Sequence, residues 1–417
     1  MADPKNFLPR SISQTAIHSL LRSLSIPIPT SITFLSTSAA YHTIYTLSYP
    51  KSTLSEFLPT PPAPNTSTTT LILRVSGTHF PSIKTLNECT ILKWLSAQTQ
   101  IPVPQVLHYD ATRDNPIGYE FILMTMAVGR SFDLVKPELS ASLSWRSYQE
   151  HLDSFVAQVV DIISELQSHR WHQIGGLREL QGGHGGDGTV IVVDGGPLVD
   201  ENMWQVPELD LFWRSGNCNG DGENVTFESL NATGPFRSYV SFLIAQAEKY
   251  IFAIRRHEKL SSMRSLVPRI LGFMAAMEDR QEELNKTRLV LAHRDFHLGN
   301  IMYDVDTRRI TAVLDWEFAA VVPAQRWDPH RAFLWNGIGS DDEVTRELRE
   351  RVVKGCKERG VTIFEDVEYT SNRQEHMQLG MNFLRAIVEV LPRDQVEKPV
   401  EAWKESMLVH VEAMSSD

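Results

Sequence analysis

Three side chains with oxygen atoms that could bind a metal lie close together in the second half of the chain: Asp295, Asn300 and Asp315. Magnesium takes hard oxygen ligands, and phosphoryl transfer from ATP also needs a carboxylate that orients the attacking hydroxyl. The spacing therefore predicts Asp295 as the catalytic carboxylate and Asn300 and Asp315 as ligands of Mg²⁺. Any one of them is more often an ordinary loop residue, but their types, spacing and strand context agree.

Short strands separate these residues and would fix the distances between them. An apolar run at 301–303 and a second run at 310–314, rich in β-forming residues, flank a polar turn. This pattern predicts a β-hairpin that returns Asp315 to the loop carrying Asp295. His293 opens the loop and is expected to organise it by hydrogen bonding, because Asp295 already has the role of base. His297 is left without an assigned role.

The pattern from His293 to Asn300, H-x-D-x-x-x-x-N, and the hairpin that returns an Asp are those of a kinase catalytic loop with its metal-binding Asp. In place of Asp-Phe-Gly stands Asp315-Trp316-Glu317. With this tripeptide the segment resembles the aminoglycoside phosphotransferase and choline kinase-like family, whose members share the protein-kinase fold but phosphorylate small molecules. The resemblance implies an α+β, protein-kinase-like two-lobed fold, with a small N-terminal antiparallel sheet lobe and a larger, mainly helical C-terminal lobe.

The same resemblance assigns ATP-binding residues to the N-terminal part. Arg74 lies in an apolar strand and Glu88 on the following helix, where the family has a phosphate-binding cation and the Glu that holds it. Taken alone, Arg74 is more typical of a solvated strand residue. The backbone from Thr125 to Ala127 resembles the hinge that binds adenine, although an ordinary buried strand has the same pattern. The turn at 36–42 would lie over the phosphates, but it contains no glycine.

Periodicity and turn residues predict the remaining elements. Helices are expected at 13–24, 83–97, 148–169, 236–257, 266–285, 342–359, 372–391 and 396–413, and strands at 32–35, 43–49, 70–75, 288–292, 301–303 and 310–314. The apolar face of the helix at 83–97 is expected to consist of Leu86, Ile91, Leu92 and Leu95. The glycine cluster at 182–188 lacks the Lys-Ser/Thr of a phosphate loop and is expected to be a flexible loop.

These elements divide the chain into an N-terminal, ATP-binding lobe at 1–126 and a C-terminal lobe at 127–417. A Pro-, Ser- and Thr-rich insertion at about 50–70 interrupts the first lobe. In the second lobe, the resemblance implies that an insertion at about 178–235 helps to build the acceptor site. Its aromatic residues are either substrate walls or packing of the insertion: Trp204, Phe212, Trp213 and Phe227. Glu317 and Asp328 are candidates for binding a cationic acceptor.

The composition excludes several classes of function. With 417 residues, 42% hydrophobic and 22% charged, the chain is typical of a soluble globular protein. The net charge of -11 argues against a nucleic-acid partner and is compatible with a cationic small-molecule acceptor. The three cysteines show no zinc-ligand spacing, and neither a signal peptide nor a membrane-spanning run is evident. A cytoplasmic location without a membrane partner is therefore expected.

Two other functions stay open on the sequence. A protein kinase would carry Asp-Phe-Gly and Ala-Pro-Glu, and both are missing. A non-catalytic nucleotide-binding module is favoured by the turn without glycines, but it would have no physical need to keep Asp295, Asn300 and Asp315 together. The sequence thus predicts a kinase that uses Mg²⁺ and ATP to phosphorylate a hydroxyl of a small molecule.

Overall fold

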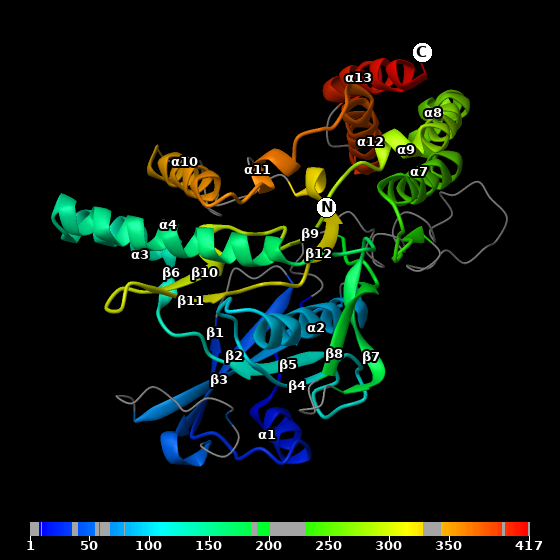
Figure 1. The fold of residues 1–417 in the computed structure, drawn as a ribbon. Helices are drawn as coiled ribbons and strands as arrows, with labels where there is room; N and C mark the ends of the chain where they lie inside the picture. The colour runs from blue at the N-terminus through cyan, green and yellow to red at the C-terminus, as the bar shows by residue number, and fades with distance from the viewer. Residues whose placement is uncertain are drawn as a thin grey trace.

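An antiparallel sheet of five strands forms the N-terminal part of the molecule, in the order β1-β2-β3-β5-β4 (Figure 1). The computed structural model describes residues 8–9, 11–35, 41–54, 58, 67–78, 80–184, 190–200, 230–327, 343–393 and 397–415. The strands of this sheet are β1 Ser31–Leu35, β2 His42–Pro50, β3 Thr68–Ser76, β4 Val106–Asp110 and β5 Phe121–Thr125.

The sheet carries α1 (Gln14–Ser23) on one face and α2 (Ile83–Gln98) on the other (Figure 1). Leu71, Leu73 and Val75 of β3 are buried in one apolar cluster with the inner side chains of α1. Successive side chains of a strand point to opposite faces of the sheet. Arg74 therefore points away from this cluster and toward α2.

The C-terminal part is mainly helical, and its helices pack around a large apolar core that also takes in part of α2. α12 and α13 lie against each other and against α7 and α8 (Figure 1). The helices are α3 Phe132–Ser142, α4 Trp145–Ser168, α7 Tyr239–Arg256, α8 Val267–Asp279, α9 Gln281–Leu284, α10 Glu343–Glu358, α11 Ile363–Asp366, α12 Asn372–Val390 and α13 Glu397–Ser415.

A serine caps the N-terminus of four of the longer helices. At α1, α4, α7 and α12 the residue before the helix is a serine whose side chain accepts a hydrogen bond from a backbone N–H of the first turn. Such a cap satisfies an N–H that has no partner within the helix and stabilises the helix by about 0.5–2 kcal/mol. The capping serines are Ser13, Ser144, Ser238 and Ser371.

Three small sheets lie in the C-terminal part, and two of them hold the segments that carry Asp295, Asn300 and Asp315. β11, β10 and β6 form one sheet, β12 pairs with β9, and β7 pairs with β8. β6 follows β5 in the sequence and pairs with β10. The chain therefore passes from the N-terminal part into the C-terminal part near residue 126. The strands are β6 Arg130–Ser131, β7 Gly176–His184, β8 Val190–Gly196, β9 Leu289–Ala292, β10 Ile301–Asp304, β11 Arg309–Val313 and β12 Ala320–Pro323.

The two stems of the chain around residues 201–229 lie side by side. The backbone N–H of Leu198 donates to the carbonyl oxygen of Thr233 over 2.6 Å. Ile174 and Phe236 bind each other next to this contact through two backbone hydrogen bonds of 2.8 Å. Residues 174, 198, 233 and 236 are therefore held together at one place.

The predicted fold class is confirmed: an antiparallel sheet forms the N-terminal part, and the C-terminal part is mainly helical. The predicted helices and strands lie within a few residues of their observed positions, although the helix expected at 266–285 is divided into α8 and α9. None of the described helices is both long and apolar enough to cross a membrane. Several predictions fall outside the described residues: those for 36–40, for most of the insertion at 50–70, for the four insertion aromatics and for Asp328.

The prediction of a flexible loop at the glycine cluster is wrong for its first residues, because 182–184 belong to β7. The β7–β8 hairpin forms because 190–193 is a run of β-branched residues, which favours a strand despite the glycines before it. α3 and β12 were not predicted either. α3 contains Pro137, which argues against a helix in sequence analysis.

Leu73 and Leu86 differ in burial, so we expect their replacement to differ in its effect on stability. Leu73 is fully buried in the apolar cluster of β3 and α1, so Leu73→Ala should lower the free energy of unfolding by about 2–5 kcal/mol. Leu86 on α2 is 40% exposed, and Leu86→Ala should change it by less than about 0.5 kcal/mol. Urea denaturation of both variants measures the difference, and equal losses would contradict the observed orientation of α2.

Candidate active site

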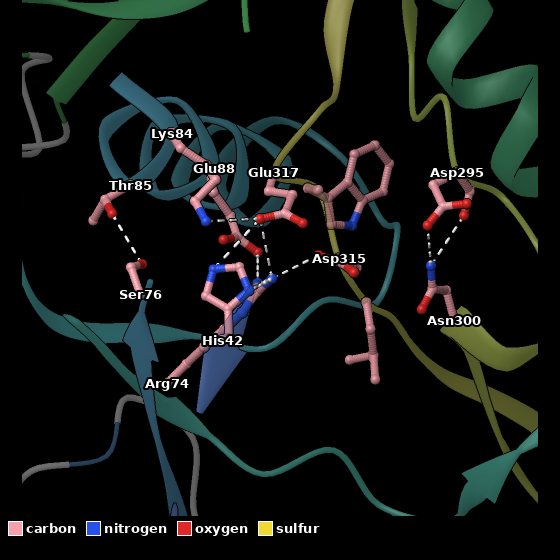
Figure 2. Close-up of polar contacts among 12 residues, drawn as sticks. His42, Arg74, Ser76, Lys84, Thr85, Glu88, Asp295, Asn300, Asp315 and Glu317 are labelled. Atoms are coloured by element: carbon pink, nitrogen blue, oxygen red, sulfur yellow. Dashed lines mark hydrogen bonds and ion pairs between the residues drawn. The ribbon is translucent and has the colours of Figure 1, made fainter. Parts of the chain in front are cut away.

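The loop after β9 brings Asp295 and Asn300 into contact. The side-chain nitrogen Nδ2 of Asn300 donates to the carbonyl oxygen of Asp295 over 3.0 Å and to its carboxylate Oδ2 over 3.3 Å. A short 3-10 turn at Leu298–Asn300 directs Asn300 back toward Asp295. The two residues therefore lie together, as the spacing predicted (Figure 2).

His293 fixes this loop from within the core. It is fully buried, and its Nε2 donates to the carbonyl oxygen of Leu314 over 2.8 Å. Its Nδ1 accepts the backbone N–H of Asp295 over 3.2 Å. Burial lowers the pKa of His293, so the ring is neutral with its proton on Nε2. These bonds join the loop to the end of the hairpin, as expected for a residue that organises the loop.

Asp295 is a carboxylate at neutral pH. Partial burial on its own would raise the pKa of this group, but His297 and Asn300 lower it below the usual value. His297 Nε2 lies 3.6 Å from Asp295 Oδ2, and the Asp295 side chain is 39% exposed. A charged, accessible oxygen is what a group that accepts a hydrogen bond from a hydroxyl needs.

The β10–β11 hairpin returns Asp315 to this loop. The backbone N–H of Leu314 donates to the carbonyl oxygen of Asn300 over 2.8 Å, so Asp315 is one residue beyond a direct contact with the loop. Asp315 has a φ of +65°, an uncommon conformation for a residue other than glycine. Its carboxylate Oδ1 accepts a 2.6 Å hydrogen bond from Arg74 Nη2. Asp315 thus faces the N-terminal sheet.

Asn300 and Asp315 are suited to bind Mg²⁺. The nitrogen of the Asn300 side chain is used by Asp295, which leaves the amide oxygen as the remaining ligand atom, and Figure 2 shows it on the side of Asp315. The Asp315 side chain is 34% exposed. Mg²⁺ is usually bound by one or two protein oxygen ligands together with substrate phosphates and water. The donor set therefore fits this metal.

Arg74 and Glu88 form the pair predicted in the N-terminal part. Arg74 Nη1 donates to Glu88 Oε1, and both residues are buried. Burial disfavours the charged form of Arg74, but Glu88, Asp315 and Glu317 together raise its pKa above the ordinary value. Arg74 is therefore a permanent cation between the two parts of the molecule.

Three further side chains join Arg74 and Glu88 in a buried charged cluster: His42, Lys84 and Glu317 (Figure 2). Glu317 Oε2 lies 3.4 Å from His42 Nε2, 3.5 Å from Lys84 Nζ and 3.6 Å from Arg74 Nη2. Burial, and after it the nearby Asp315, raises the pKa of Glu317 above its ordinary value, whereas Lys84 and Arg74 lower it. Glu317 is 2% exposed and faces this cluster, so its proposed role in binding a cationic acceptor is wrong.

His42 and Lys84 were not predicted, and one of the four residues expected on the apolar face of α2 was misplaced. Ile91, Leu92 and Leu95 are buried, as predicted. Leu86 was expected on the apolar face but is 40% exposed. Lys84, Asn87 and Glu88 are buried instead. Their spacing of three and four residues places them on one side of a helix, and this is the signal that could have identified them.

The two residues predicted to bind adenine, Thr125 and Ala127, differ in what their backbone N–H groups contact. The backbone N–H of Thr125 donates to the carbonyl oxygen of Gln105 over 3.0 Å, so it is already used within the sheet. The next residue, Met126, donates to Thr70 over 3.3 Å. Ala127 follows β5, and none of the described residues accepts a hydrogen bond from its N–H. Ala127 is therefore the backbone donor that adenine could use.

The fold and these contacts agree with a kinase-like phosphotransferase. The chain belongs to the phosphotransferase enzyme family (APH), whose model matches residues 65–325. This range contains Arg74 and Glu88 at one end and the segment from Asp295 to Glu317 at the other. The predicted family is confirmed.

Among known proteins, the chain is similar to subtelomeric hrmA-associated cluster proteins from two strains of Aspergillus fumigatus. Each is 22% identical over 270 residues, which cover 57% of this chain and 50% of the relative. The chain thus matches about half the length of these relatives.

Two solved structures are similar at low sequence identity. A thermostable mutant of aminoglycoside phosphotransferase APH(4)-Ia, in a ternary complex with ADP and hygromycin B, is 13% identical and covers 93% of this chain and 95% of its own, with a TM-score of 0.42. The macrolide 2'-phosphotransferase MphH from Brachybacterium faecium is 12% identical and covers 94% and 97%, with a TM-score of 0.41.

The charged cluster predicts a large loss of stability when its central cation is removed. Arg74→Met leaves Glu88 buried without its main counter-charge and removes one of the cations beside Glu317, which should lower the free energy of unfolding by about 3–5 kcal/mol. Arg130→Met removes the exposed pair with Glu138 and should leave the urea midpoint unchanged, since exposed ion pairs contribute little. A midpoint for Arg74→Met that equals that of Arg130→Met would show that the cluster does not depend on Arg74.

Proposed function

We propose that this protein is a small-molecule kinase that transfers the γ-phosphoryl group of ATP to a hydroxyl. The observation that supports it is the contact between Asp295 and Asn300 together with the return of Asp315 beside them. One loop and one hairpin thereby bring together a charged base and two oxygen ligands. Phosphoryl transfer depends mainly on positioning and on charge stabilisation, and this arrangement can provide both.

Asp295 is the group that orients the acceptor. Its carboxylate is charged and partly exposed, and the backbone around it is held by His293 and Asn300. A hydroxyl that donates a hydrogen bond to Asp295 would have its oxygen directed at the phosphorus, and its proton would pass to the carboxylate as the new bond forms.

Arg74 and the metal ligands act on the phosphates. Arg74 would contact the α and β phosphates, with Glu88 holding its guanidinium in place. Asn300 and Asp315 would hold Mg²⁺, which when bound neutralises charge on the β and γ phosphates. Arg74 already approaches Asp315 to 2.6 Å, so the phosphate-binding cation and the metal ligand face the same space.

Adenine would bind at the end of β5. Ala127 supplies a backbone N–H, and the backbone from Thr125 to Ala127 is the segment that would run beside the base. The acceptor is a small molecule that presents a hydroxyl. Because Glu317 is occupied within the charged cluster, the support for a cationic acceptor is now limited to the net charge of -11.

Replacement of the base tests the proposal. Asp295→Asn keeps the shape of the side chain and its contact with Asn300 but removes the charge that accepts the proton. Transfer of label from γ-labelled ATP into a small-molecule extract of the source cell should fall by about 10²–10⁴-fold, while the affinity for Mg²⁺-ATP stays nearly unchanged. An Asp295→Asn protein that labels the same product at the wild-type rate would exclude Asp295 as the base.

A second variant tests the metal ligand and separates the proposal from a non-catalytic module. Asp315→Ala should lose the part of ATP binding that depends on Mg²⁺, as measured by calorimetry with and without EDTA. If the wild-type protein labels no product, and Mg²⁺-ATP does not raise its melting temperature, the protein is not a kinase.

A further inference from the structure

We propose that Lys84 and Asn87 are positioning residues that hold the segment from Asp315 to Glu317 in its metal-binding conformation. The inference rests on the proposed role of Asp315 as a ligand of Mg²⁺, and it extends that role to a face of α2 that contacts neither substrate nor metal.

The face in question consists of Lys84, Asn87 and Glu88, which are 1%, 3% and 2% exposed. Residues spaced by three and four positions lie beside each other on a helix. All three are polar, yet they point into the molecule and toward the segment after β11 (Figure 2 shows Lys84 and Glu88). A helix buries such a face at a high desolvation cost unless each group has a partner. The partners identify what the face does.

Asn87 holds the backbone of this segment. Its Nδ2 donates to the carbonyl oxygen of Glu317 over 3.2 Å and to that of Ala319 over 2.9 Å. Its amide oxygen is buried without a hydrogen-bond partner among the described residues. An unpaired buried acceptor costs stability, so asparagine is present here for its two donors.

These two bonds help to hold Asp315 in a strained conformation. Asp315 has a φ of +65°, which costs an aspartate about 1 kcal/mol or more and persists only when its surroundings fix it. Trp316 is fully buried, and its Nε1 donates back across Asp315 to the carbonyl oxygen of Val313 over 3.0 Å. Asn87 fixes the chain beyond Asp315, at residues 317 and 319. The strained residue is therefore enclosed by contacts that hold the chain before and after it.

Lys84 acts on the same segment through the side chain of Glu317. Its Nζ lies 3.5 Å from Glu317 Oε2 and 5.4 Å from the centre of the Tyr41 ring. Within the described part of the chain, Nζ has no hydrogen-bond partner, so charge attraction to Glu317 is its main polar interaction. At 1% exposed, Lys84 does not reach the space in which the phosphates would bind.

The charge of Lys84 decides which carboxylate Arg74 contacts. Arg74 Nη2 is 2.6 Å from Asp315 Oδ1 and 3.6 Å from Glu317 Oε2. Without Lys84, Glu317 would have to take its counter-charge from Arg74, because a buried carboxylate needs a close cation. Arg74 would then move away from Asp315, and Asp315 would lose the contact that orients it.

Calorimetric titration with ATP, in Mg²⁺ and separately in EDTA, tests the inference without an acceptor. Lys84→Met and Asn87→Ala should each weaken binding in Mg²⁺ by about 10–100-fold, the usual effect of losing a residue that orients a metal ligand. Binding in EDTA should change by less than about 2-fold, because neither residue contacts the nucleotide. Lys93→Met is the matched control, since Lys93 lies on α2 but its side chain is 34% exposed and paired with Glu179.

A further variant tests whether Lys84 acts through Glu317. Lys84→Met leaves Glu317 buried beside one cation fewer, and the double change Lys84→Met with Glu317→Gln removes both charges and should recover the melting temperature. Mg²⁺-dependent binding should recover as well, because the uncharged side chain at position 317 would no longer draw Arg74 away from Asp315. A double variant that is as stable as the wild-type protein but still binds Mg²⁺-ATP as weakly as Lys84→Met would contradict this role of Lys84.

The outcomes are distinct. If folded Asn87→Ala and Lys84→Met keep the wild-type ratio of ATP affinities in Mg²⁺ and EDTA, Lys84 and Asn87 do not position Asp315. That result contradicts this inference alone if Asp315→Ala removes the difference between ATP affinity in Mg²⁺ and in EDTA. If the wild-type protein itself shows no difference between Mg²⁺ and EDTA, the proposed function fails as well.

Discussion

A hydrogen bond between Arg74 and Asp315 joins the N-terminal sheet to the C-terminal part beside the loop that carries Asp295. Arg74 of β3 donates to Asp315, 241 residues further along the chain, and the distance is 2.6 Å. A guanidinium that is 8% exposed requires counter-charges around it, because a buried ion without partners is strongly disfavoured. Glu88, Asp315 and Glu317 provide the negative charges, and Lys84 balances the excess. The requirement to neutralise Arg74 thus accounts for the burial of Glu88 and Glu317.

This requirement also explains the composition of α2. A helix that packs on a sheet usually buries an apolar stripe. α2 buries Cys89, Ile91, Leu92 and Leu95 in its later turns, but its first turns bury charged and amide side chains. The helix therefore has two functions along its length: the later turns pack on the core, and the first turns hold the segment after β11.

The proximity of Asp295, Asn300 and Asp315 could be predicted because it is set by local structure. Asp295, Asn300 and Asp315 are separated by one turn and one hairpin, and both can be identified from residue types over a short stretch. The burial of Lys84 and the inward direction of Glu317 depend on partners that are distant in the sequence. Leu86 shows the same limit, because an apolar residue at helical spacing was assigned to the core although the opposite face is buried. The fold class followed from the family resemblance, but the β7–β8 hairpin did not, because glycines concealed its strand pattern.

The contact between Leu198 and Thr233 has a consequence for how such a protein can diversify. One hydrogen bond joins Leu198 to Thr233, so a change in the number of residues between them need not move the elements on either side. Loop-closure entropy rises slowly with length, by about 0.6 kcal/mol for each doubling. The sequence between these two residues could therefore change in length during evolution while the charged cluster and the loop that carries Asp295 keep their positions.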